Sequence, residues 1–133
     1  MITEDYVSFE TAKLLKEKSF DCCCRVWYAE YTSQYGTEKY ISIEFDNHNK
    51  FDENHKFVCF VPTLQMAMKW LRKVHNIDID IKSYWKIKPK YHIHGYKYRL
   101  HYNNAPNHDI NQSFNSYEEA CEAAIKYCLE NLI

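Results

Sequence analysis

The sequence predicts an α+β fold in which a leading helix is followed by two antiparallel strand–strand(–strand)–helix units, with the helices packed on one sheet face. Residues 39–75 and residues 77–133 carry this prediction. Each stretch shows alternating apolar residues, a capping residue and then an amphipathic helix. The 133 residues suffice for one hydrophobic core, so a single domain over residues 1–133 is expected. We expect the strands of both units to merge into one sheet.

Capping residues and helical spacing predict the first two helices. Ser8 can cap a helix over residues 9–18, because its hydroxyl can accept a hydrogen bond from the first turn. Thr63 can cap a second helix in the same way, and that helix is expected to end at His75 and Asn76. Its apolar residues follow the spacing of one helix face: Leu64, Ala67, Met68 and Leu71.

Period-two alternation of apolar and polar residues predicts the strands between these helices. The alternation runs over residues 21–29 and, after a turn at residues 33–36, over residues 41–45. A short apolar strand over residues 56–61 is expected to end at Pro62, because proline has no N–H for a sheet ladder.

The second unit contains the clearest strand signal. Apolar and polar residues alternate over residues 77–88, and residues 91–102 are the natural hairpin partner beyond Pro89. A short strand is expected near residues 110–114.

A capping box formed by Ser116 and Glu119 predicts the start of the third helix. One face of this helix carries a narrow stripe of mostly small residues, which lets it lie close to a sheet. The stripe consists of Tyr117, Ala120, Cys121, Ala124 and Cys128.

Composition favours a cytoplasmic protein without a cofactor. The first residues contain no basic segment followed by an apolar one, and no apolar run approaches the roughly 20 residues that a membrane span requires. No association with a membrane is therefore expected. We expect the six cysteines to be reduced and to act as small core residues rather than to form disulfides.

Three segments carry a resemblance: YVSFETAKLLKEK over residues 6–18, PTLQMAMKWLR over residues 62–72 and SYEEACEAAIKYCLENLI over residues 116–133. They resemble small uncharacterised proteins of gut bacteria (Bacteroidales) and of their phages or mobile elements. The resemblance covers the three predicted helices. It implies an accessory bacterial or phage protein, and it supplies neither an activity nor a catalytic residue.

Positive charge gathers on the predicted hairpin. Six lysine and arginine residues, and no carboxylate, lie within residues 82–101, with aromatic residues between them. Cations for phosphates and rings for bases suit single-stranded nucleic acid, although a solvated sheet face that discourages aggregation has the same composition. If Ile79, Ile81, Trp85, Tyr98 and Leu100 point inward, their neighbours point outward. The candidate nucleic-acid-binding residues are Lys82, Tyr84, Lys86, Lys88, Lys90, Lys97, Arg99 and His101.

Metal binding is another hypothesis. Cys22 and Cys24 share one predicted strand face, and so do His92 and His94. On adjacent strands these side chains could supply the two thiolates and two imidazoles of a tetrahedral zinc site. Their spacing matches no familiar zinc motif, and core cysteines with solvated histidines explain the same residues.

The expected function is non-enzymatic. The sequence contains no nucleophile elbow, phosphate-binding loop, zinc-protease motif or dinucleotide fingerprint. We expect a small cytosolic binding or adaptor protein of bacterial or phage origin whose exposed aromatic sheet surface contacts another protein. A nucleic-acid-binding protein that uses residues 82–101 is the alternative, and a zinc-dependent protein is the third hypothesis. The partner, the strand order and the oligomeric state, a homodimer included, stay open.

Overall fold

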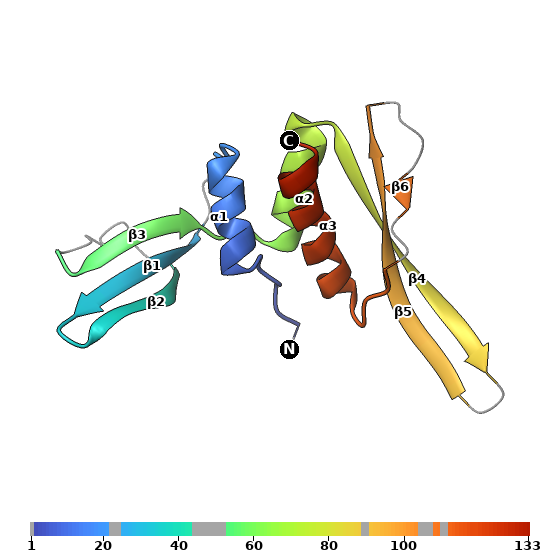
Figure 1. The fold of residues 1–133 in the computed structure, drawn as a ribbon, viewed down its shortest axis with the longest axis horizontal. Coiled ribbons are helices and arrows are strands. Elements are labelled where there is room, and N and C mark those ends of the chain that lie inside the picture. Colours follow the sequence, from blue (N-terminus) through green and yellow to red (C-terminus); the bar gives the residue numbers. More distant parts are fainter. Residues whose placement is uncertain (1, 22–24, 44–52, 89–90, 104–107, 110–111) are drawn as a thin grey trace.

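A computed structural model describes residues 2–21, 25–43, 53–88, 91–103, 108–109 and 112–133, and these residues form an α+β fold (Figure 1). The predicted fold class and the leading helix are confirmed. In chain order the described elements are α1 (Phe9–Glu17), β1 (Val26–Ser33), β2 (Gly36–Ile43), β3 (His55–Phe60), α2 (Leu64–Val74), β4 (Ile77–Lys88), β5 (Tyr91–Tyr102), β6 (His108–Asp109) and α3 (Tyr117–Asn131).

The described strands form two separate antiparallel sheets. In the first sheet β1 lies between β2 and β3, and in the second β5 lies between β4 and β6. The helices lie between the two sheets (Figure 1), with α1 against β3 and with α2 and α3 against β4. The expectation of one merged sheet is therefore wrong, because each sheet buries its apolar side chains against helices instead of continuing into the other sheet.

The helices begin at the predicted caps. In each one the side-chain oxygen of the capping residue accepts a hydrogen bond from the backbone N–H three residues later, at 3.1–3.3 Å, and these caps are Ser8, Thr63 and Ser116. Helix α2 ends at Val74 and is followed, as expected, by His75 and by Asn76, whose φ of 54° is the left-handed conformation that asparagine tolerates. Within the described ranges, no helix is both long enough and apolar enough to cross a membrane.

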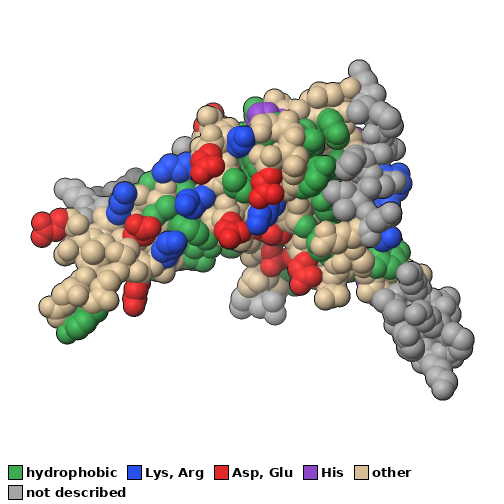
Figure 2. Space-filling view, viewed as in Figure 1, with side chains coloured by type: hydrophobic (Ala, Val, Ile, Leu, Met, Phe, Trp, Pro, Cys, Tyr) green, Lys and Arg blue, Asp and Glu red, His purple; other side chains and the backbone are tan. Residues whose placement is uncertain are grey.

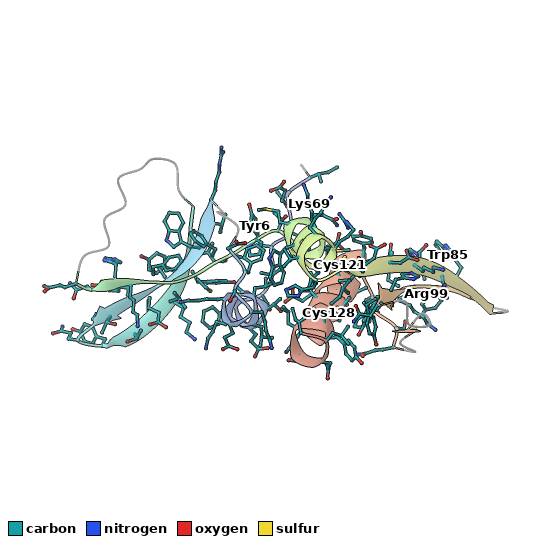
Figure 3. All side chains as sticks on the ribbon, turned by 90° about the horizontal axis from the view of Figure 1, so that it is seen from above. Tyr6, Lys69, Trp85, Arg99, Cys121 and Cys128 are labelled. Carbon is teal, nitrogen blue, oxygen red and sulfur yellow. The ribbon has the colours of Figure 1, made fainter. Side chains whose placement is uncertain are left out.

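Helix α3 is the centre of the hydrophobic core. It packs against α1, α2, β4 and β5, and Cys121 and Cys128 lie near the middle of the molecule (Figure 3). The predicted stripe of small residues is buried, although Tyr117 at its start is 37% exposed. Larger side chains of this helix are buried as well, so more than one of its faces is covered. The α3 side chains with 0% exposure are Ala120, Cys121, Ala124, Ile125, Cys128 and Leu129.

The β4–β5 hairpin is paired along its whole length, from Ile77 opposite Tyr102 to Lys88 opposite Tyr91. Both strands have the predicted bounds. Helices α2 and α3 cover the part of the hairpin near Ile77, whereas its distal part extends beyond them (Figure 1). The short third strand lies earlier than expected, at His108–Asp109. Phe114 forms an isolated bridge with Tyr96, and residues 110–111 lie outside the described part.

Candidate functional site

The register of the β4–β5 hairpin divides its side chains between two faces. One face, called the helix-side face, carries Ile79 opposite Leu100 and Ile81 opposite Tyr98. These residues pack on the core, and burial raises the pKa of Tyr98 to about 12. The opposite face, called the outer face, carries Asp78, Asp80, Lys82 and Tyr84 on β4 and His101, Arg99, Lys97 and Gly95 on β5.

The outer face contains carboxylates beside its cations. Lys82 Nζ lies 3.9 Å from Asp80 Oδ2, and Arg72 at the end of α2 lies 3.9 Å from Asp78 Oδ1. Arg99 lies between Asp80 of β4 and Asp109 of β6 in the sheet register. Acidic residues that precede and follow the basic stretch in sequence are thus brought next to it by strand pairing. The stretch of residues 82–101 itself contains no carboxylate, but strand pairing places Asp80 beside it on the outer face.

The Tyr84 side chain on the outer face is fixed by contacts with Lys97 and Ser113. Its ring lies under Lys97, whose Nζ is 5.1 Å from the ring centroid, and its hydroxyl makes a hydrogen bond with Ser113 Oγ. The ring crosses Gly95, where an added Cβ would lie 2.5 Å from Tyr84 Oη and 2.9 Å from Ser113 Oγ. Glycine is therefore needed for this close approach. A phenol fixed in this way is poorly placed to stack on a base.

The remaining predicted nucleic-acid residues differ in exposure, and some lie outside the described part of the chain. Lys97, Arg99 and His101 are half-buried, while Lys82 is exposed. The side chains of Lys86 and Lys88, and Lys90 as a whole, lie outside the described part of the chain. The structure therefore brings Lys82, Tyr84, Lys97, Arg99 and His101 together on one face, as parity predicts, but it intersperses them with aspartates.

Trp85 departs from the sequence prediction. It lies on the helix-side face with Ile79 and Ile81, as expected from parity, yet 64% of its side chain is exposed. Figure 3 shows it on the distal part of the hairpin, beyond the helices that bury the earlier residues of β4. The prediction of an inward Trp85 is therefore wrong in burial, because the strand is longer than the helical layer that covers it.

Trp85 begins a row of aromatic side chains on the helix-side face. Its indole stacks on the His94 imidazole, with ring centroids 4.2 Å apart and an interplanar angle of 5°. His94 lies 4.8 Å from Tyr96, and Tyr96 meets the Tyr117 ring edge to face at 6.3 Å. Trp85, His94, Tyr96 and Tyr117 are called the aromatic row. These ring contacts favour one orientation of each side chain, and Trp85 at the end of the row is 64% exposed.

The zinc hypothesis finds no support in the described residues. Cys22 and Cys24 and the side chain of His92 lie outside the described part, and His94 is stacked on Trp85. The strand after the cysteines, β1, pairs with β2 and β3, whereas His94 belongs to β5 of the other sheet. The adjacency that the hypothesis requires is thus absent between these described strands. Over the same described ranges, no three His, Cys, Asp or Glu side chains gather as a metal site would require.

A groove of about 520 Å³ lies between the N-terminal segment and the start of α3. Asp5, Glu118, Glu119 and Glu122 line it, together with apolar side chains. Two of these carboxylates have structural partners. Glu119 Oε2 accepts a hydrogen bond from Asn115 N at 3.2 Å, and Glu122 Oε1 accepts hydrogen bonds from Ser8 N at 3.0 Å and from Thr11 Oγ1 at 2.6 Å. Glu122 therefore stabilises the start of α1 and Glu119 the start of α3 through these hydrogen bonds.

On the face of the molecule shown in Figure 2, the charged side chains that the structure describes are of both signs. Figure 2 shows lysine and arginine side chains interspersed with aspartate and glutamate side chains over the helices and the first sheet.

Comparison with known proteins gives no relative: no family model, no curated protein and no solved structure matches the chain.

Proposed function

We propose that this chain is a small, non-enzymatic binding or adaptor protein of the cytoplasm, of bacterial or phage origin, whose aromatic row contacts a protein partner. The observation that carries the proposal is the exposure of Trp85, 64%, on a hairpin that projects beyond the helices. An exposed tryptophan held in one orientation is a typical anchor of protein interfaces, because it buries a large apolar area at a small cost in conformational entropy.

The charges of the hairpin support a protein partner over nucleic acid. Lys82 has the Asp80 carboxylate beside it, and Asp78 and Asp80 share the outer face with Lys97 and Arg99. A phosphate backbone would meet carboxylates there as well as cations. Protein interfaces tolerate such a mixture at their rim, where charged pairs contribute little to affinity.

Trp85→Ala is expected to abolish the interaction while the fold is retained. Tagged wild-type protein and the variant would be used to capture proteins from a lysate of the organism that encodes the chain, with quantification by mass spectrometry. We expect a defined set of proteins to fall about tenfold or more with the variant, the effect typical of losing a central aromatic anchor. The melting temperature should change little, because the side chain is mostly exposed.

Tyr35→Ala is the matched control. Tyr35 is 91% exposed in the turn between β1 and β2, so its loss removes an exposed ring from the other sheet. Capture with Tyr35→Ala should equal capture with the wild type. An identical set of proteins with all three baits, or the same losses with both variants, would contradict a role of the aromatic row.

Single-stranded nucleic acid is the second candidate ligand. The observation that favours it is the stack of the exposed Trp85 on His94, because an exposed aromatic ring can stack on a base of any sequence. Lys82 lies on the same strand, and Lys86 and Lys88 follow in the sequence.

Fluorescence anisotropy with single-stranded oligonucleotides tests this candidate. Binding should be detectable at about 50 mM salt, where electrostatic attraction is little screened, and should weaken steeply as salt rises. Trp85→Ala should lower the affinity about fivefold or more, since stacking on one aromatic ring typically contributes about 1–3 kcal/mol. Absence of binding at low salt, or equal affinities of the wild type and Trp85→Ala, would exclude the aromatic row as a nucleic-acid-binding surface.

A further inference from the structure

We propose that two copies of the chain associate edge to edge, with β4 of one copy antiparallel to β4 of the other and with Ile81 at the twofold axis. The interaction surface is the open edge of the second sheet, and its occupant is a second copy of this chain. Pairing would continue the sheet through both copies with a closed, symmetric interface. The inference goes beyond the proposed function and does not rest on it.

The open edge of β4 is long enough for such pairing. The strand has 12 residues, and among the described strands only β5 pairs with it. An open edge of this kind presents backbone N–H and C=O groups in a row, to which another strand can add. The distal part of β4 projects past the helices (Figure 1), so α2 and α3 leave the edge accessible there.

Charges along β4 favour an antiparallel copy. Asp78 and Asp80 lie in the first half of the strand, Lys82 follows them on the same outer face, and Lys86 and Lys88 come later in the sequence. A parallel copy in matching register would place like charges opposite each other. An antiparallel copy can place Asp80 of each strand opposite Lys82 of the other, and cross-strand pairs of opposite charge are stabilising.

The register follows from the charged side chains that the structure describes on this strand, which are Asp78, Asp80 and Lys82. With Ile81 opposite Ile81 of the second copy, Asp80 lies opposite Lys82 of the second copy, and symmetry repeats this pair across the axis. A shift of the axis to Asp80 or Lys82 would place identical charges opposite each other. Ile81 is only half-buried by its own helices, so an isoleucine from the second copy would cover its exposed part.

This register also places the exposed Trp85 beside apolar side chains of the second copy. Trp85, 64% exposed, would lie opposite Ile77 of the second copy, which is 2% exposed and follows the end of that copy's α2. Val74, the last residue of α2, is 60% exposed. The net formal charge of −1 gives little long-range repulsion between copies.

Sedimentation equilibrium of the purified chain under reducing conditions tests the proposal. We expect a reversible dimer with a dissociation constant between about 1 µM and 1 mM, the range of small, transient interfaces. Asp80→Lys and Lys82→Asp should each weaken the dimer about tenfold, because two symmetric pairs change from attraction to repulsion. The double variant Asp80→Lys/Lys82→Asp restores opposite charges in this register and should regain the wild-type dissociation constant.

Tryptophan emission gives a second readout that needs no charge variant. Trp27 and Trp70 are 5% and 7% exposed, so Trp85 is the tryptophan whose emission should shift to the blue as the concentration rises. Trp85→Phe should remove this shift while the dimer persists. A chain that stays monomeric at about 1 mM overturns the proposal. Single variants that dimerise like the wild type, or a double variant that does not recover, overturn it equally.

Discussion

Leu100→Ala is expected to lower the free energy of unfolding by about 2–5 kcal/mol, the range of large-to-small substitutions in well-packed cores. Leu100 is 0% exposed on the helix-side face of β5, opposite Ile79, which is 7% exposed. Helix α3 packs on this face and also contacts α1 and α2, so it cannot move freely to fill the space that the leucine leaves. Urea denaturation followed by circular dichroism measures the change.

Ile41→Ala is the matched control for this substitution. Ile41 also lies in a strand, β2, but 54% of its side chain is exposed, so its truncation removes little buried area. We expect a loss below about 1 kcal/mol, since exposed substitutions are usually small in effect. Equal losses for the two variants would contradict the packing of α3 on the hairpin.

Local signals in the sequence predicted the helices and the main hairpin well. Ser8, Thr63 and Ser116 cap helices as expected, because capping depends on a side chain and the backbone N–H groups that follow it closely. The bounds of β4 and β5 followed from alternation and from the interruption at Pro89. Such features require no knowledge of distant parts of the chain.

Features that depend on distant contacts were not predictable in this way. The division into two sheets results from the position of the helices between them, and no residue pattern encodes that arrangement locally. Alternation assigned Trp85 to the correct face of the hairpin but could not show where the covering helices end. The burial of a strand residue depends both on the sheet face to which it points and on whether a helix covers that part of the face.

The candidate site shows the same division. Parity placed Lys82, Lys97 and Arg99 on one face, and the structure does so as well. The sequence did not show that strand pairing sets Asp80 opposite Arg99. No Asp or Glu lies within residues 82–101, but a residue outside this stretch can still be a neighbour across the sheet. If the hairpin register had been known, the acidic residues before Lys82 could have been identified as neighbours of the basic residues on β5.

Raising the pH from about 9 to 11 is expected to destabilise the protein through its buried thiols. The described cysteines, Cys59, Cys121 and Cys128, are free and buried. Burial raises the pKa of Cys59 above its ordinary value, that of Cys121 to about 11 and that of Cys128 to about 12. In this pH range the unfolded chain loses thiol protons that the native state keeps, so stability falls as pH rises, by up to about 1.4 kcal/mol per pH unit for each thiol.

The double variant Cys121→Ala/Cys128→Ala separates this effect from other titrating groups. Removal of both thiols costs some packing at every pH, but it also removes the two groups with the highest thiol pKa values, so the slope of stability against pH should become shallower. Tyr98, whose pKa burial raises to about 12, remains in both proteins and contributes a destabilisation of the same sign at higher pH. The slope between about pH 9 and 11, measured by urea denaturation with reductant present, is therefore the readout. Equal slopes in the wild type and the variant would show that these thiols ionise as easily in the native state as in the unfolded chain, which contradicts their burial on the core side of α3.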